Sequence, residues 1–354
     1  MVFNLFFFLY FCNNRLLNLM TGLSNTIGKE FFGKKIVIVG DLVADQFLRG
    51  TIARVSREAP VFILRHDETE TLAGGAANAA VNVASLGGNA VLVGLVGKDS
   101  NGSALLEKLR QAKVDCSFVI VAEKYQTTTK VRVLAGQHYA PRQQVIRIDY
   151  ETREPVADEL QDKLKRNLLS AAQDADAIIV SDYNYGVANA LILEITRKIT
   201  ERKNVPVLVD SRFNLESFNG ATTATPNQEE VEQILGKDFT EADCVELCRN
   251  LGFESLLITR GNKGMLLIEK DRTPMRFEAV GAKEPIDVTG AGDTVIAAYA
   301  LALASGLSFS DAANLANHAG GIVVMKKGTA SVGADELLAS LSKHADGERK
   351  AQTS

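Results

Sequence analysis

The sequence has few of the residues that build disulfide frameworks and metal sites. Its 354 residues include only four cysteines and four histidines. Cys244 and Cys248 are four residues apart in a segment of helical pattern, so both face one side, but no histidine is near enough in sequence to complete a metal site. We therefore expect the thiols to be free or buried, as in proteins of a reducing cytoplasm.

An excess of positive charge is also missing. The net charge is −4 at pH 7, and 23% of the residues are charged. A protein that binds nucleic acid needs a broad basic surface, so we expect no nucleic-acid partner. The 46% of hydrophobic residues is enough for a sizeable core, which is typical of a globular protein.

The apolar run at the N-terminus, Val2–Cys12, is too short to cross a bilayer, which takes about 20 residues. It also lacks the leading positive charge and the small-residue cleavage site of a signal peptide. We expect residues 1–33 to be an extension outside the fold, with Met20 as a candidate true start. A peripheral membrane anchor is the alternative; otherwise we expect no membrane partner.

Two common nucleotide-binding motifs are absent. The pair Gly97-Lys98 has Leu92 where a Walker A loop needs its first glycine, and Asp99 where it needs Ser or Thr. The first apolar run continues into GDLVADQ rather than G-x-G-x-x-G, which argues against an ordinary dinucleotide fold.

Short apolar, β-branched runs alternate with helical patterns along most of the chain. This alternation predicts an α/β layer fold with a mostly parallel sheet. In such sheets ligands bind beyond the carboxyl ends of the strands, so the polar residues after each run matter most. The runs are KKIVIVG (34–40), AVLVGLVG (90–97), DAIIVSDY (176–183), VPVLVDS (205–211) and SLLITRG (255–261).

Two stretches, Gln46–Glu70 and Cys116–Tyr150, break this pattern. Both show strand-like alternation without a convincing crossover helix, as in TTTKVRVL (127–134). They predict a small antiparallel sheet that projects from a main domain at residues 34–342 and serves as a lid. Because an exposed sheet edge often pairs between subunits, we expect a homodimer through the lid. Residues 343–354 are expected to be a frayed tail.

The most informative segment is DVTGAGDT, Asp287–Thr294. Its two glycines allow a sharp turn that brings backbone N–H groups together, and the apolar run that follows predicts a buried helix. A glycine turn at the start of a helix favours a bound anion such as phosphate. There Asp293 can accept the proton of an attacking hydroxyl, as phosphoryl transfer requires, although a plain helix cap is the alternative.

This segment resembles the second signature of the ribokinase-like (PfkB) carbohydrate kinases, and residues 74–102 resemble the first. The similarity runs from about Lys34 to about Leu341. Within the family the chain looks most like D-glycero-β-D-manno-heptose-7-phosphate kinases, whether separate or as the first half of bifunctional heptose enzymes. The resemblance implies a three-layer α/β/α fold with a β lid, and a sugar or sugar phosphate as substrate.

The resemblance implies a role for each residue of the turn. Asp293 would be the catalytic base, and the amides of Gly290, Ala291 and Gly292 would form the anion hole. Some relatives bind K⁺ beside this hole, and the corresponding positions here are Asp287 and Thr289 with the 326–331 loop.

The resemblance also assigns the residues around ATP, Mg²⁺ and the sugar. Asn227 and Glu230, in N-x-x-E spacing, would organise Mg²⁺ and the ATP phosphates through water. The nucleotide would lie along Thr259, Gly261 and Asn317, and the sugar hydroxyls would be held by Asp45, Gly74, Gly75 and Asn78. Simpler readings stay open: a solvated acid at Asp45, plain turn glycines at 74–75, and a first-turn helix charge at Glu230.

Two departures from the heptose kinases leave the sugar open. Tyr185 stands where they carry Lys in S-D-Y-x-K-G, and Asp210-Ser211-Arg212-Phe213 replaces D-P-K-G. The sequence also contains no H-x-G-H nucleotide site of a nucleotidyltransferase half. Another sugar, such as fructose, ribose, a phosphofructose or a nucleoside, is an alternative substrate, and a non-catalytic sugar- or nucleotide-binding protein is the alternative function. The candidate contacts to a substrate phosphate are Lys130, Arg132, Arg147 and Arg212.

Overall fold

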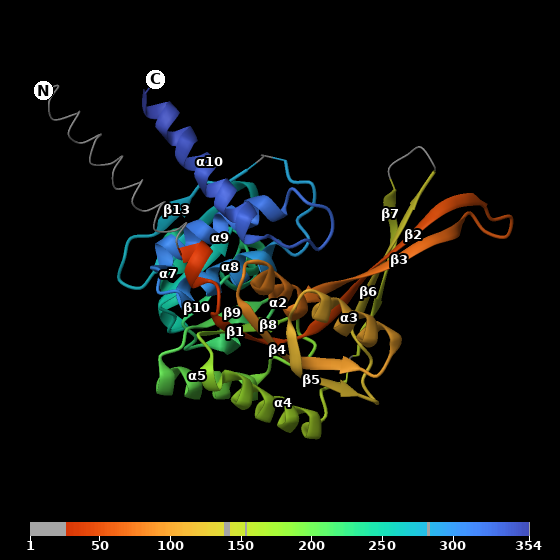
Figure 1. The fold of residues 1–354 in the computed structure, drawn as a ribbon, viewed down its shortest axis with the longest axis horizontal. Helices are drawn as coiled ribbons and strands as arrows, with labels where there is room; N and C mark the ends of the chain where they lie inside the picture. The colour runs from red at the N-terminus through yellow and green to blue at the C-terminus, as the bar shows by residue number, and fades with distance from the viewer. Residues whose placement is uncertain (1–25, 138–141, 153, 282–283, 354) are drawn as a thin grey trace, which may run out of the picture.

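The computed structural model of the chain describes residues 26–137, 142–152, 154–281 and 284–353. Within them, nine strands form a central sheet with the order β13-β12-β11-β10-β9-β8-β1-β4-β5 (Figure 1). The pairings from β5 to β11 are parallel, and β12 and β13 pair antiparallel at one edge, so the mostly parallel sheet is confirmed. The strands are β1 (Lys35–Gly40), β4 (Asn89–Gly97), β5 (Asp115–Ala122), β8 (Ala177–Asp182), β9 (Val207–Ser211), β10 (Thr223–Ala224), β11 (Ser255–Thr259), β12 (Met265–Glu269) and β13 (Met275–Phe277).

Helices cover both faces of this sheet, and strand β1 shows why. Ile36 and Ile38 are buried in one apolar cluster, whereas Val37 and Val39 are buried in the other. A strand that is buried on both faces reads as a continuous apolar run, which is its appearance in the sequence. The predicted three-layer α/β/α arrangement is therefore confirmed (Figure 1).

The helices divide between the two clusters. The first cluster includes α2 (Ala76–Ser85), α3 (Ser100–Gln111), α8 (Ala291–Ala304), α9 (Phe309–Val323) and α10 (Ala334–Thr353). The second includes α4 (Asp158–Ala171), α5 (Ala190–Lys203), α6 (Gln228–Leu235) and α7 (Glu241–Asn250). Cys244 and Cys248 on α7 are buried free thiols, as the sequence predicts. Among the described residues, no helix combines the length and the apolar character needed to traverse a bilayer.

A second sheet, the lid, projects from the body on the right of Figure 1. Its order is β3-β2-β6-β7, with antiparallel pairs β2–β3 and β6–β7 joined by a parallel pairing of β2 with β6. That pairing is parallel because both strands leave the body from the same place, where the Ala44 amide donates to the Thr128 carbonyl. The strands are β2 (Leu42–Val55), β3 (Phe62–Gly75), β6 (Thr129–Gly136) and β7 (Gln143–Tyr150).

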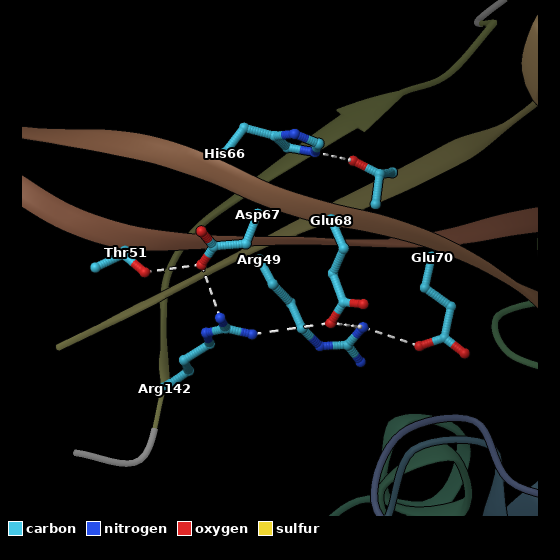
Figure 2. A network of polar contacts seen from close by, with 8 residues as sticks. Arg49, Thr51, His66, Asp67, Glu68, Glu70 and Arg142 are labelled. Atoms are coloured by element: carbon cyan, nitrogen blue, oxygen red, sulfur yellow. Dashed lines mark hydrogen bonds and ion pairs between the residues drawn. The ribbon is translucent and has the colours of Figure 1, made fainter. Parts of the chain in front are cut away.

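Polar contacts hold the outer part of the lid together (Figure 2). Arg49 on β2 contacts Glu68 and Glu70 on β3, with nitrogen–oxygen distances of 3.4 and 2.9 Å. Asp67 on β3 accepts from the Thr51 hydroxyl at 2.8 Å and from Arg142, beside β7, at 2.7 Å. Exposed ion pairs each add less than about 1 kcal/mol, so this network fixes strand register more than it stabilises the fold.

Three predicted boundaries need correction. Asp115–Ala122 is strand β5 of the main sheet rather than part of the lid, because it pairs with β4. The fold begins before residue 34, since Ile27 and Phe31 are buried in the first apolar cluster. The expected frayed tail is helical as far as Thr353, which reflects its Ala, Lys, Arg, Glu and Gln residues. The apolar residues 1–20 lie outside the described residues.

Candidate active site

A cavity of about 890 Å³ lies where the carboxyl ends of the parallel strands face the lid. It brings together predicted residues from strands, turns and helices that are far apart in sequence. Gly74, Asn78 and Asp287 are not part of its lining. The predicted residues that line it are Asp45, Gly75, Lys130, Arg212, Asn227, Glu230, Thr259, Gly261, Thr289, Gly290, Ala291, Gly292, Asp293 and Asn317.

The glycine turn begins α8 at one wall of this cavity. Gly290 has φ 76°, the left-handed region, and a Cβ there would lie 2.5 Å from Nδ2 of Asn78. Both facts require glycine. The Ala291 amide donates to the Val288 carbonyl at 3.2 Å, so the turn itself uses one of the three predicted anion-hole donors. The amides of Gly290 and Gly292 donate to no other described residue and are open to a ligand.

Asp293, in the first turn of α8, is only 3% exposed. Its Oδ2 accepts from Nδ2 of Asn78 at 2.8 Å, and its Oδ1 accepts from the Tyr183 hydroxyl at 3.1 Å. Both partners come from other elements, which argues against a plain helix cap. Burial raises the pKa of Asp293 to about 7, against the lowering effect of these two hydrogen bonds. Asn78 therefore contacts the expected base rather than the sugar side of the cavity.

Two further carboxyl groups, Asp210 and Glu230, line the cavity near Asp293. Burial raises the pKa of both, and for Asp210 the negative charges of Asp293 and Glu230 raise it further, well above its ordinary value. Glu230 and Asn227 also form a capping box, with each side chain accepting from the other residue's amide at 2.9 Å. The N-x-x-E pattern is thus the start of α6. The described residues contain no group of three or more acidic, His or Cys side chains arranged to hold a metal ion, so a divalent cation here would also need oxygen ligands from the nucleotide.

The lid side of the cavity is basic: Lys130 and Arg132 come from β6, and Arg147 comes from β7. Arg212, which follows β9 of the main sheet, adds a fourth cation to the lining, and we call these four residues the basic corner. Arg132 donates to Oδ1 of Asp45 at 2.6 Å, and Arg147 pairs with Asp149 at 2.8 Å. Among the described residues, Lys130 and Arg212 have no ion-pair partner within 4.0 Å. The two unpaired cations are therefore the ones available to an anionic substrate.

Asp45 is buried, so it is not the solvated loop acid of the simpler interpretation. A Cβ at Gly74 would lie 2.6 Å from its Oδ2, which explains why glycine is needed beside it. On the other side of the turn, Asp287 accepts from the amides of Thr289 and Gly328, both at 2.9 Å. The positions predicted for a K⁺ site therefore do lie together.

Sequence reasoning assigned no role to three residues at or next to the site: Asp210, described above, and the pair Asp41 and Tyr183. Asp41 follows β1 and accepts from the amides of Tyr183, Tyr185 and Val187 at 2.8 to 3.0 Å. Tyr183 in turn contacts Asp293. Both lie in segments of the family resemblance, but only folding brings the end of β1 against the loop after β8.

Comparison with known proteins settles the family. The family model described as pfkB family carbohydrate kinase matches residues 34–336. The chain belongs to the PfkB family of carbohydrate kinases. It is therefore a sugar kinase.

Curated relatives of this PfkB kinase are longer than the chain. Bifunctional protein HldE of Haemophilus influenzae is 42% identical over 315 residues, which are 87% of this chain and 63% of that protein. The HldE of Proteus mirabilis is 39% identical over 322 residues, 90% of this chain and 66% of its own length. The chain thus spans about 63 to 66% of these relatives.

Solved structures share the fold at lower identity. Arabidopsis thaliana ribokinase, solved with ribose and ATP, has a TM-score of 0.66 at 22% identity, covering 88% of this chain and 99% of its own. Escherichia coli phosphofructokinase-2, solved with potassium, has a TM-score of 0.70 at 18% identity, covering 88% and 100%. The PfkB kinase described here therefore has the ribokinase-like fold.

Proposed function

We propose that this kinase transfers the γ-phosphoryl group of ATP to O1 of heptose 7-phosphate. The product would be heptose 1,7-bisphosphate, a precursor of ADP-heptose. The observation that carries the phosphoryl transfer is that Asp293 and the open amides of the glycine turn share one cavity. The heptose is supported by the 42% identity with HldE and by the resemblance to heptose-7-phosphate kinases.

Asp293 would accept the proton of the attacking hydroxyl. Its pKa of about 7 makes it a better proton acceptor than an ordinary aspartate, and it is mostly ionised above neutral pH. The amides of Gly290 and Gly292 would donate to the oxygens of the γ-phosphoryl group as it transfers. Phosphoryl transfer needs mainly positioning and charge stabilisation, and this arrangement provides both.

The residues around the nucleotide complete the proposal. Asp210 and Glu230 would hold Mg²⁺, with Glu230 acting through water, and the bound ion neutralises charge on the ATP phosphates. Asp287 and Thr289, with the 326–331 loop, would hold K⁺. ATP would lie along Asn227, Thr259, Gly261 and Asn317, which all line the cavity.

The sugar would lie under the lid against Asp45 and Gly75, with its phosphate at the basic corner. Lys130 and Arg212 are the unpaired cations there, so we assign the phosphate to them. Arg132 would instead orient Asp45, whose free oxygen Oδ2 can accept from a sugar hydroxyl.

An ADP-release assay over a panel of sugars tests the substrate. The panel pairs each phosphorylated sugar with its free form: heptose 7-phosphate with heptose, fructose 6-phosphate with fructose, and ribose 5-phosphate with ribose. We expect the highest kcat/KM for heptose 7-phosphate and at least a tenfold preference for phosphorylated over free sugars, because two cations favour the phosphate. A preference for a free sugar would contradict the heptose assignment. Sugar binding without ADP release from any member would instead indicate a non-catalytic binding protein.

We also propose a homodimer through the lid, in the cytoplasm. Apolar side chains on the lid are exposed, with exposed fractions of 57% for Phe62 and 53% for Ile146. Such side chains are typical of a surface that a second subunit covers. Light scattering should show a dimer that Ile146→Glu converts to monomer. The free thiols Cys116, Cys244 and Cys248 support a reducing compartment.

A further inference from the structure

We propose that Tyr183 is a positioning residue for Asp293, and that the carboxylate of Asp41 holds Tyr183 in place. This proposal rests on the proposed role of Asp293 as the base. It assigns to the loop after β8, residues 183–187, a function in aligning the reacting carboxylate.

The first step is the geometry at Asp293 itself. Asn78 on α2 donates to one carboxylate oxygen at 2.8 Å, and Tyr183 donates to the other at 3.1 Å. A carboxylate that is held at both oxygens by different elements cannot rotate freely about its terminal bond. Each oxygen keeps a further lone pair, so the substrate hydroxyl can still bind.

The second step is the direction of the Tyr183 bond. Burial and the negative charges of Asp293 and Asp210 raise the pKa of Tyr183 well above its ordinary value. Its hydroxyl therefore keeps its proton at any working pH and donates to Asp293. A hydrogen bond of this direction favours the ionised carboxylate, which is the form that acts as a base.

The third step is the support of the loop. Asp41 is 1% exposed, and its two oxygens accept three amides: Tyr183 and Tyr185 at one oxygen, Val187 at the other. The loop includes two residues in the left-handed region, Asn184 with φ 63° and Gly186 with φ 93°. Such a conformation is costly for a non-glycine residue, so the loop depends on these bonds to keep its shape.

The same loop provides a matched control. The Tyr185 hydroxyl donates to Glu151, beside the lid strand β7, at 2.5 Å, and within the described part of the chain it makes no hydrogen bond with Asp293. Lys130 lies over both tyrosine rings, 5.9 Å from the centre of Tyr183 and 5.6 Å from that of Tyr185. Removing either hydroxyl therefore disturbs the same loop and the same lysine, but only one of them contacts the base.

The test compares Tyr183→Phe with Tyr185→Phe in full pH–rate profiles, with thermal unfolding of each variant. For Tyr183→Phe we expect kcat near pH 7 to fall about tenfold. This factor corresponds to the free energy lost with one hydrogen bond to a charged group. The acidic limb of its profile should move to higher pH, while KM for ATP changes less than twofold. Tyr185→Phe should leave the acidic limb in place.

An unchanged acidic limb in Tyr183→Phe, or an equal shift in Tyr185→Phe, would overturn the proposal. Asp41→Asn should shift the limb in the same direction as Tyr183→Phe, and the double variant should show less than the sum of the two effects. If Asp41→Asn does not fold, the tyrosine pair alone decides. Full activity of Asp293→Asn would refute the proposed function itself, whereas an inactive Asp293→Asn with an unshifted Tyr183→Phe refutes only this inference.

Discussion

The two walls of the cavity carry opposite charges and are built in different ways. The wall at the glycine turn uses backbone amides and buried carboxyl groups on regular elements, with Asp293 at the first turn of α8. The lid wall uses long basic side chains, some paired and some unpaired. In the proposed function the first wall would carry out the phosphoryl transfer, and its geometry follows from a local glycine pattern. The second would select the sugar, and its properties depend on which charged side chains pair with each other.

The largest expected effect comes from removing the base. Asp293→Asn should lower kcat by at least about 100-fold, the low end for loss of a general base. ATP affinity, measured by calorimetry, should stay within a few-fold because the turn amides are unchanged. In the unaltered enzyme, kcat should fall as the pH drops below about 7, since protonation of Asp293 removes the base. Activity of the variant within a few-fold of the unaltered enzyme would show that the wall at the glycine turn does not provide the base.

A smaller effect should separate the unpaired from the paired cations of the lid wall. Lys130→Met keeps the length of the side chain and removes its charge, so KM for a phosphorylated sugar should rise about tenfold or more. Arg147→Gln is the matched control, because Arg147 is already paired with Asp149. We expect its KM to change less than threefold, and KM for ATP to stay unchanged in both. Equal effects of the two substitutions would mean that pairing does not decide which cation binds substrate.

The smallest effect concerns stability at the turn. Gly290→Ala places a Cβ 2.5 Å from Asn78 and 2.9 Å from Thr329, at a left-handed position. Gly306→Ala, with φ 81° and nothing within 4 Å, carries only the conformational cost, about 1 kcal/mol. Urea unfolding should therefore show a larger loss of stability, about 2–3 kcal/mol, for Gly290→Ala. Similar losses would show that the turn has room to relax.

Much of the wall at the glycine turn could be predicted from the sequence, because the sequence patterns that form it are local. The apolar runs that predict parallel strands, the glycines of 287–294 and the apolar helix after them are all contiguous in the chain. The N-x-x-E spacing was also visible, although its capping box explains part of the pattern without any ligand.

The remaining features depend on contacts between distant segments. The contact of Asn78 with Asp293 joins residues 215 positions apart, and no local pattern distinguishes it from a contact with a sugar. Strand β5 alternates like a lid strand, because an edge strand of the main sheet is half exposed. The pairing of Arg132 with Asp45 depends on the register of β6 with β2, which a single sequence does not specify.

Asp41 is the only residue between β1 and β2, so the backbone passes through it from the main sheet into the lid. This is one of the lid's connections to the body; the others follow Gly75, precede Thr129 and follow Tyr150. The carboxylate of the residue that joins β1 to the lid is also the one that accepts the three amides of the tyrosine loop. The chain segment that leads into the lid is therefore tied directly to the loop that contacts Asp293.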